Sequence, residues 1–189
     1  KESLKILKET NALLEGHFIL SSGLHSKQYV QCAKLLSYPK KAEAICSSLC
    51  EKIQEEFNTI DIILSPAIGG ILVGYEVGRQ LDIETIFAER LKEQLILRRG
   101  FKITKNSNVL IVEDVITTGK SALECSELIK ASKSKLIGYA CIIDRSDSKS
   151  LIKDKIVSQI KLEIDTYNNK ELPNELKKIK PTKPGSRNL

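Results

Sequence analysis

The stretch NVLIVEDVITTGKSALE, residues 108–124, decides the fold of this chain. It begins with a run of Val, Leu and Ile, which is typical of a strand that is buried on both faces of a sheet. Two adjacent carboxylates, Glu113 and Asp114, follow this run. A short segment of threonine and glycine then leads into a pattern that is typical of a helix, from about residue 120 to 132. The stretch therefore predicts a strand, an acidic strand end and a turn at the N-terminus of a helix.

Apolar strands alternate with amphipathic helices on both sides of this stretch. This alternation predicts an α/β fold with a central, mainly parallel sheet that is flanked by helices. In open sheets of this type, ligands bind at the carboxyl ends of the strands. The expected strands are residues 61–65, 84–89, 109–113 and 135–144, and the expected helices are residues 1–15, 38–57, 69–81 and 120–132.

The N-terminal part of the chain has a different pattern. The segment HFILSSGLHSKQYVQC, residues 17–32, places a Ser-Ser-Gly turn between two short strand-like runs and so predicts a β-hairpin. The whole chain has 189 residues, a length that is typical of a single domain.

Composition narrows the classes of function. No apolar run approaches the roughly 18–20 residues that span a bilayer, so we expect no membrane partner. The five cysteines show no C-x-x-C spacing, and the two histidines are distant from them in the sequence, which argues against a zinc site. Scattered cysteines of this kind predict buried thiols in a reducing cytoplasm. The net charge of +6 favours anionic partners, but the lysines are spread along the chain.

The turn that begins at Thr117 is a candidate phosphate site. A Walker A motif is excluded because Asp114 occupies the position of its first glycine. What remains is a turn at a helix N-terminus, which can bind one phosphate through backbone amides. The adjacent carboxylates suit a sugar phosphate, because they accept hydrogen bonds from hydroxyl groups, and a metal ion can also lie near them. The alternative is an acidic, threonine-capped helix start, which does not explain the Glu-Asp pair.

Two further strand ends admit a functional and a structural interpretation. The segment SPAIGG, residues 65–70, contains paired glycines that let the backbone approach an anion, but a plain strand-to-helix turn has the same composition. The segment 89–102 contains five cations, and a mobile loop of this charge could close over a polyphosphate. An exposed, charged hairpin is the alternative for this segment.

The segment IIDRS, residues 142–146, places Arg145 at the end of an expected strand. A guanidinium group in this position can hold a carboxylate with two parallel hydrogen bonds. The alternative is a surface ion pair with Asp144 or Asp147.

Taken together, these segments resemble a known family. VLIVEDVITTGKS resembles the phosphoribosyl-pyrophosphate (PRPP) motif of the type I phosphoribosyltransferases. HFILSSGLHSKQYVQC, FAERLKEQLILRRGF, IIDRS and LPNELKKIKPTKPGSRNL resemble the orotate phosphoribosyltransferase family, in the branch with a short catalytic loop. The resemblance implies a Mg²⁺-dependent glycosyltransferase that transfers ribose 5-phosphate from PRPP to orotate. The products are orotidine 5′-monophosphate and pyrophosphate, a step in de novo pyrimidine (UMP) biosynthesis.

The resemblance also implies roles for individual residues. PRPP would be bound by Glu113, Asp114, Val115, Ile116, Thr117, Thr118, Gly119, Lys120 and Ser121. Orotate would contact Thr117 and Arg145, and Asp114 would hold the metal together with PRPP. The loop facing pyrophosphate would consist of Ala67, Ile68, Gly69 and Gly70, and the catalytic loop would supply Arg90 and Lys92. A hood over the base would include Ser22, Gly23 and Tyr29.

The family further implies a hood of about residues 1–35 plus the C-terminal segment, and a core of about residues 36–165. It implies a homodimer in which the catalytic loop acts in trans. Two alternatives have different substrates or partners. A phosphoribosyltransferase for another base is disfavoured, since purines and uracil have no carboxylate for Arg145 to hold. A regulator that binds nucleic acid is allowed by the net charge, but the sequence has no aromatic and basic stacking platform, so we expect no nucleic-acid partner.

Overall fold

The computed structural model describes residues 2–20, 22–146 and 150–184. The chain divides into two compact units, one made of residues 36–162 and the other of residues 1–35 together with 163–189. The larger unit contains a six-stranded sheet and the smaller unit contains a three-stranded sheet. Within the described residues, no helix is both long and apolar enough to cross a membrane.

The sheet of the larger unit has the strand order β5-β4-β3-β6-β7-β8. All neighbouring strands are parallel except β4 and β5, which are antiparallel. The mainly parallel α/β sheet that the sequence predicts is therefore confirmed. The strands are β3 (Ile62–Pro66), β4 (Glu84–Leu91), β5 (Gln94–Leu97), β6 (Asn108–Ile116), β7 (Lys135–Asp144) and β8 (Ile156–Lys161).

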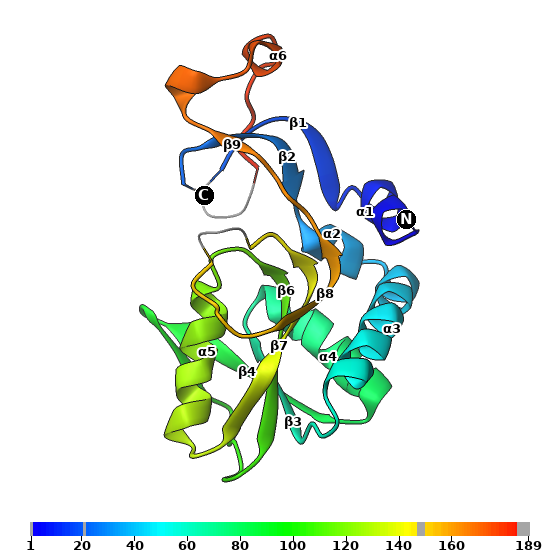
Figure 1. Ribbon diagram of the computed structural model, residues 1–189, viewed down its shortest axis with the longest axis vertical. Coiled ribbons are helices and arrows are strands. Elements are labelled where there is room, and N and C mark those ends of the chain that lie inside the picture. Colours follow the sequence, from blue (N-terminus) through cyan, green and yellow to red (C-terminus); the bar gives the residue numbers. More distant parts are fainter. Residues whose placement is uncertain (1, 21, 147–149, 185–189) are drawn as a thin grey trace. The chain divides into compact units, whose positions relative to one another are not determined.

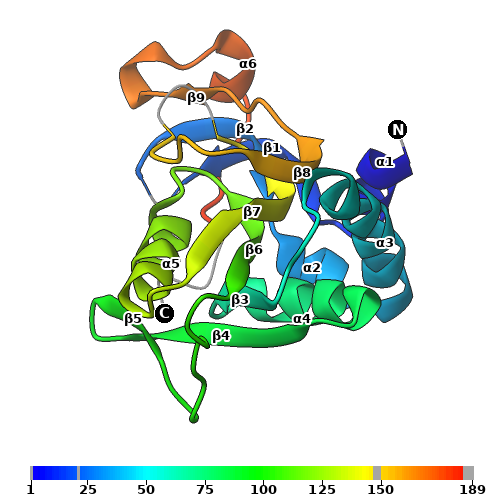
Figure 2. The same ribbon diagram turned by 60° about the horizontal axis from the view of Figure 1, so that its bottom comes forward.

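Helices cover both faces of this sheet, as Figures 1 and 2 show. Helices α3 (Pro39–Glu56) and α4 (Gly69–Leu81) lie on one face, and α5 (Lys120–Ala131) lies on the other. All residues of β3 and residues 109–112 of β6 are buried between these layers, which explains why these parts of the strands are near-continuous runs of Ile, Val and Leu.

Glycines let α4 lie close to the sheet. Gly70, Gly74 and Gly78 recur every fourth residue, so they share one face of the helix. A Cβ atom at Gly74 would collide with the Oγ atom of Ser65 on β3, and one at Gly78 would collide with Thr85 on β4. The glycine content of α4 is therefore a packing requirement of the face that meets the sheet.

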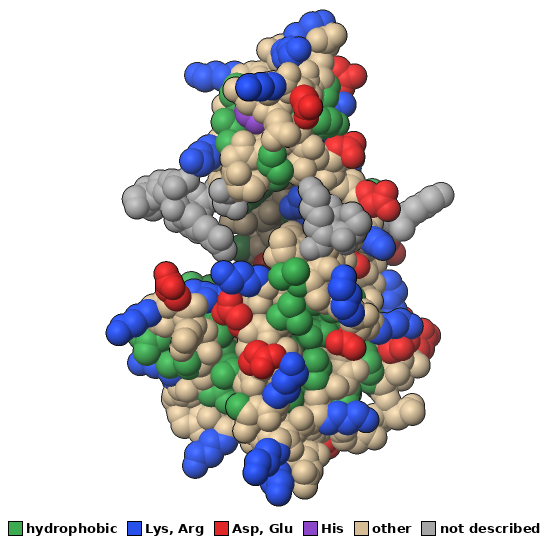
Figure 3. Space-filling view, turned by 60° about the vertical axis from the view of Figure 1, so that its left-hand side comes forward, with side chains coloured by type: hydrophobic (Ala, Val, Ile, Leu, Met, Phe, Trp, Pro, Cys, Tyr) green, Lys and Arg blue, Asp and Glu red, His purple; other side chains and the backbone are tan. Residues whose placement is uncertain are grey.

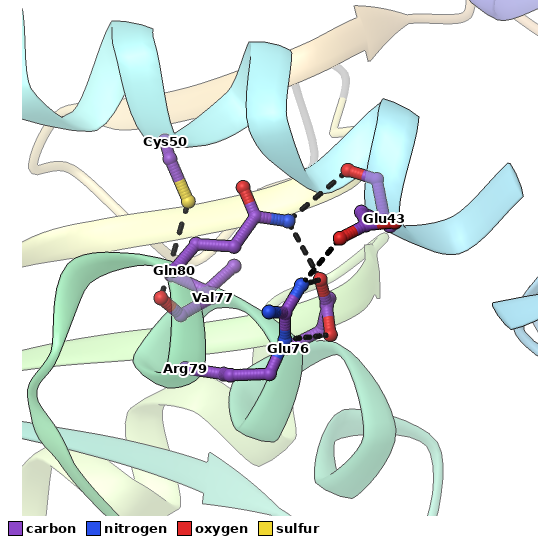
Figure 4. Close-up of polar contacts among 6 residues, drawn as sticks. All are labelled: Glu43, Cys50, Glu76, Val77, Arg79 and Gln80. Atoms are coloured by element: carbon purple, nitrogen blue, oxygen red, sulfur yellow. Dashed lines mark hydrogen bonds and ion pairs between the residues drawn. The ribbon is translucent and has the colours of Figure 1, made fainter. Parts of the chain in front are cut away.

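A polar cluster joins α4 to α3 at the surface (Figure 4). The guanidinium group of Arg79 donates to Glu76 in its own helix at 2.7 Å and to Glu43 of α3 at 2.8 Å. The side-chain amide of Gln80 donates to the carbonyl oxygen of Glu43 at 3.1 Å. The hydrogen bonds from Arg79 lower the pKa of Glu76, so the cluster stays charged at neutral pH.

The smaller unit is built on the predicted hairpin. Strands β1 (Leu13–Ile19) and β2 (His25–Val30) are antiparallel, which confirms the expected hairpin, and β9 (Thr166–Tyr167) adds to the free edge of β2. The remaining short elements of the chain are α1 (Glu2–Glu9), α2 (Cys32–Leu36), η1 (Asn169–Glu171) and α6 (Asn174–Lys177).

The predicted helix over residues 1–15 is wrong in its second half. Helix α1 ends at Glu9, and Asn11 adopts a left-handed conformation with φ of 54°. Asparagine tolerates this conformation better than most residues, so the chain turns there and β1 begins at Leu13. Leu13 and Leu14 thus belong to a strand, because pairing with β2 replaces the helical hydrogen bonds.

Candidate active site

The site lies at the carboxyl ends of β3 and β6, which are neighbours at the centre of the large sheet. Helix α4 follows β3 and leads to β4, whereas α5 follows β6 and leads to β7. These two helices lie on opposite faces, so the strand order reverses between β3 and β6 (Figure 2). Ligands of open α/β sheets bind at such a switch point.

Two helix N-termini meet the sheet at this point. The N-cap residues are Ile68 for α4 and Gly119 for α5, and neither makes a side-chain capping hydrogen bond. The first-turn amides of a helix have no partner within the helix, and the helix dipole adds positive potential there. The arrangement therefore favours anionic groups on both sides of the switch point.

Asp114 lies against the turn that precedes α4. A Cβ atom built on Gly69 would be 2.8 Å from both carboxylate oxygens of Asp114, so only glycine leaves room for this carboxylate. One of those oxygens also accepts the backbone N–H of Val115 at 2.9 Å. The structure thus brings together Asp114 and the loop of Ala67 to Gly70, which are about 45 positions apart in the sequence. The Ala67–Ile68 peptide bond in this loop is cis.

The acidic pair lies within β6 and not beyond its end. The strand continues to Ile116, because Glu113 and Val115 still pair with Cys141 and Ile143 of β7. The sequence predicts a strand that stops at residue 113, and this prediction is too short. Successive strand residues point to opposite faces, so the two carboxylates leave the strand in different directions.

Burial changes the acidity of both groups. Burial, and to a smaller extent the charge of Asp114, raises the pKa of Glu113 to about 8. Burial also raises the pKa of Asp114, although the N–H of Val115 opposes this shift. The negative charge of Glu113 adds to the burial that raises the pKa of Cys125 on α5 to about 12. A cation near this pair would favour the charged carboxylates.

The turn after β6 leads into α5. Thr117 and Thr118 are exposed, and Gly119 has φ of 79°, which favours glycine. A Cβ atom on Gly119 would also be 2.6 Å from the side chain of Ile152. The carbonyl oxygen of Thr118 accepts the N–H of Leu151 at 3.0 Å, which fixes the outer side of the turn. Lys120 and Ser121 then begin α5.

Arg145 follows β7 and lies beside the end of β6. Its backbone N–H donates to the carbonyl oxygen of Ile116 at 2.8 Å, so its backbone is adjacent to Thr117. The carboxylate of Asp144, one alternative partner for the guanidinium group, accepts the N–H of Ser146 at 2.7 Å. Asp147, the other alternative partner, lies outside the described residues. The structure therefore groups Thr117 and Arg145, the two residues expected to contact a base.

The cationic segment 89–102 is a β-hairpin at its start and not an irregular loop. Leu91 of β4 pairs with Gln94 of β5, so Lys92 and Glu93 form a two-residue turn, with φ of 55° at Lys92. Arg90 forms an ion pair with Glu124 of α5 at 2.8 Å. Arg90 thus has an anionic partner on another part of the chain.

Arg99 is held by its own hairpin. Its guanidinium group makes two hydrogen bonds to Glu89, at 3.0 Å and 2.9 Å, and lies 5.9 Å from the ring centroid of Phe87. Sequence reasoning missed the role of Glu89 and Glu124 as partners of these cations. Nothing in the sequence pattern indicates the Arg90–Glu124 pair, because it joins a strand to a helix on another part of the chain.

The hairpin residues that are expected to form the hood lie in the smaller unit. The hydroxyl group of Ser22 accepts the N–H of Leu24 at 3.4 Å, and Gly23 has φ of 81° with open space where a side chain would be. The ring of Tyr29 packs 5.8 Å from the ring of Phe18, measured between centroids. Ser22 and Gly23 therefore form an exposed tip, whereas Tyr29 packs on β1.

Comparisons with known proteins identify the class. Residues 36–175 match the family described as the phosphoribosyl transferase domain. This chain therefore belongs to that class of protein, and its mainly parallel α/β sheet flanked by helices agrees with the match.

Similarity to individual relatives identifies a more specific family within this class. The chain is 46% identical over 184 residues to orotate phosphoribosyltransferase of Caldicellulosiruptor bescii, an alignment that covers 97% of this chain and 96% of the relative. It is 43% identical to orotate phosphoribosyltransferase of Parvibaculum lavamentivorans, with coverage of 98% and 97%. The crystal structure of orotate phosphoribosyltransferase from Aeropyrum pernix has a similar fold, with a TM-score of 0.73 and 21% identity over 84% of this chain and 93% of that one. This chain belongs to the orotate phosphoribosyltransferase family.

Proposed function

We propose that this chain transfers ribose 5-phosphate from PRPP to orotate and releases orotidine 5′-monophosphate and pyrophosphate. The observation that supports this proposal most directly is the site between β3 and β6. There Asp114 lies against Gly69, beside the N-termini of α4 and α5, whose N-cap residues make no side-chain hydrogen bond. One helix start can hold the 5′-phosphate and the other the pyrophosphate, while carboxylate oxygens accept hydrogen bonds from the ribose hydroxyls.

Different residues at the switch point are assigned to different parts of PRPP. We assign the 5′-phosphate to the turn of Thr117 to Ser121, in which Thr117 and Thr118 are exposed at the N-terminus of α5. We assign the pyrophosphate to the loop of Ala67 to Gly70. The transition state separates positive charge on the sugar from negative charge on the leaving group, so dipoles that face the leaving group lower the barrier.

The base site is assigned to Thr117 and Arg145. Their backbones are adjacent because the N–H of Arg145 is bonded to Ile116. A guanidinium group matches the planar carboxylate of orotate, which uracil, adenine and hypoxanthine lack. We assign the smaller unit, with Ser22, Gly23 and Tyr29, to the hood over the base.

Mg²⁺ fits the acidic pair as a partner of the substrate. In the described residues, no three His, Cys, Asp or Glu side chains form a metal cluster. Mg²⁺ is usually held by one or two carboxylates together with substrate phosphates, and Asp114 supplies such a carboxylate. When bound, the ion would neutralise charge on the pyrophosphate. Burial raises the pKa of both Glu113 and Asp114, and a bound Mg²⁺ would favour their charged forms.

We also propose a cytoplasmic homodimer that binds neither membrane nor nucleic acid. All five cysteines are buried free thiols, which supports a reducing compartment. On the face of the protein in Figure 3, Lys and Arg side chains alternate with Asp and Glu side chains, so that face offers no continuous basic surface for a phosphate backbone. Lys92 lies in the exposed turn of the β4–β5 hairpin, and we assign it the contact with the site of a second subunit.

A direct assay tests the activity. The protein is incubated with PRPP, Mg²⁺ and orotate, and the loss of orotate absorbance is followed. Orotate should be consumed, whereas hypoxanthine, adenine and uracil should be poor substrates. Turnover of one of those three bases, with none of orotate, would show that the base site has been assigned wrongly.

A further inference from the structure

The chain has two histidines, His17 and His25, and the proposed reaction uses neither of them. They contact each other in the smaller unit. The Nε2 atom of His17 lies 2.6 Å from the Nδ1 atom of His25, and both residues are buried, with exposed fractions of 4% and 8%. The imidazole group changes charge between pH 5 and 8. A buried pair in direct contact can therefore couple the structure around it to pH.

His17 holds the C-terminal segment on β1. Its Nδ1 atom lies 2.8 Å from the carbonyl oxygen of Ile179. Its own carbonyl oxygen accepts the N–H of Thr182 at 2.9 Å, and the N–H of Ile19 donates to the carbonyl oxygen of Thr182 at 2.8 Å. The red end of the chain accordingly runs beside β1 in Figure 1. The hydroxyl group of Thr182 also donates to the carbonyl oxygen of His17 at 3.3 Å. Two side-chain and two backbone hydrogen bonds thus fasten residues 179–182.

The hydrogen atoms of this pair can be assigned from the contacts. The carbonyl oxygen of Ile179 only accepts, so the Nδ1 atom of His17 carries a hydrogen. In neutral His17 the Nε2 atom is then an acceptor, and His25 must donate to it from Nδ1.

One additional proton can bind to the Nε2 atom of His25. Neither the contact between the two histidines nor the contact between His17 and Ile179 then has to change. A second additional proton places N–H groups on both atoms of a 2.6 Å contact, and that contact must break.

Other ionisable groups lie on the elements that pack against the pair. Lys27 of β2 and Glu175 of α6 form an ion pair at 2.7 Å, and Glu15 of β1 pairs with Lys8 at 2.8 Å. The hydrogen bond from Lys27 lowers the pKa of Glu175, so this carboxylate stays charged where imidazole titrates. Further ionisable groups on these elements and beside them include Tyr29 of β2, Lys177 of α6, Asp165 and Tyr167 at β9, and Lys178 and Lys180 beside Ile179.

We propose that His17 and His25 form an acid-sensitive latch for the C-terminal segment. The latch holds residues 179–182 on β1 while the pair carries at most one additional proton, and it releases them when both imidazoles are protonated. The released state binds one proton more than the latched state. The ratio of released to latched protein therefore rises by up to about tenfold per pH unit as the pH falls through the second titration.

Amide hydrogen exchange at Ile19 and Thr182 measures the latched population, when protection is expressed relative to the intrinsic exchange rate. Between pH 8 and pH 5 we expect protection to fall at least about tenfold in the unaltered protein. His25→Asn keeps an amide donor near the position of Nδ1 but does not titrate, so its protection should change less than about twofold. Glu175→Gln is the matched control, because it removes a nearby ionisable group. In this variant protection should decrease as much as in the unaltered protein.

The histidine tautomers supply a test that needs no variant. Nitrogen NMR of the two imidazoles at pH 8 should show hydrogen on Nδ1 of His17 and on Nδ1 of His25. Hydrogen on Nε2 of His17, protection that does not vary with pH, or an equal fall in His25→Asn would each overturn the latch. If protection no longer decreases between pH 8 and pH 5 in Glu175→Gln, the latch is also overturned, since the release would then come from the Lys27–Glu175 ion pair.

Discussion

Gly69→Ala tests whether the acidic residue and the loop after β3 act together on PRPP. The new Cβ atom would be 2.8 Å from both carboxylate oxygens of Asp114. Either the carboxylate or the loop must move by about 0.6 Å to restore ordinary van der Waals contact. Moving the carboxylate would also weaken its hydrogen bond with the N–H of Val115. The substitution thus displaces the two groups that we assign to ribose and pyrophosphate.

The expected effect is on catalysis and not on folding. A displacement of about 1 Å in a site can cost roughly 100-fold, so we expect kcat/KM for PRPP to fall at least about tenfold, or about 1.4 kcal/mol. Gly69 is exposed and begins a helix, where alanine is tolerated. The free energy of unfolding should therefore stay within about 1 kcal/mol of the unaltered value.

Gly78→Ala is the matched control in the same helix. Its Cβ atom would meet the hydroxyl group of Thr85 and lie 2.9 Å from the carbonyl oxygen of Ile83, away from the site. We expect it to lower the free energy of unfolding by about 1–3 kcal/mol and leave kcat/KM per folded molecule unchanged. Initial rates of orotate consumption and thermal melting separate the two effects. The assignment is refuted if Gly69→Ala keeps kcat/KM within twofold of the unaltered protein.

Three further predictions concern the base site, the subunits and the thiols. Arg145→Lys should weaken apparent orotate affinity by roughly 1.5–3 kcal/mol and spare PRPP binding, because lysine lacks the planar fork; equal losses for both substrates in titrations would place Arg145 in folding. Lys92→Ala and Asp114→Asn should each be inactive, and after subunit exchange a mixture should recover about a quarter of the unaltered activity if the hairpin acts in trans. No recovery despite proven exchange would contradict this. Thiol-specific labelling at pH 8 should require unfolding, because burial raises the pKa values; rapid labelling of folded protein would contradict this. The raised values are about 12, about 11 and about 12 for Cys46, Cys50 and Cys125.

The same thiols make stability depend on pH. A folded thiol with a raised pKa keeps a proton that the unfolded chain releases above about pH 8.5. The unfolded state then binds fewer protons, so the free energy of unfolding falls as the pH rises from there, by up to about 1.4 kcal/mol per pH unit for each thiol. Denaturant unfolding between pH 8 and 11 measures this slope, and a stability that does not change would contradict it.

Sequence by itself determined the elements that carry the site. The Ile- and Val-rich strands and the glycine-rich helix start are local patterns, and helix α4 and strand β7 have the predicted bounds of 69–81 and 135–144. The acidic pair and the threonine turn are also adjacent in the chain, so their chemistry is visible without a fold. The helix over residues 1–15 could not be predicted correctly, because pairing of Leu13 with Val30 overrides the helical pattern.

Only the tertiary structure decided which distant residues meet. The contact between Gly69 and Asp114 depends on β3 and β6 being neighbours, and strand order is not a property of any local segment. The Arg90–Glu124 ion pair and the His17–His25 contact arise in the same way, from packing between elements. Burial raises the pKa of Glu113 to about 8 for the same reason. Local patterns follow from short-range sterics and hydrogen bonding, whereas solvent exclusion and long-range contacts exist only once the sheet and helices have assembled.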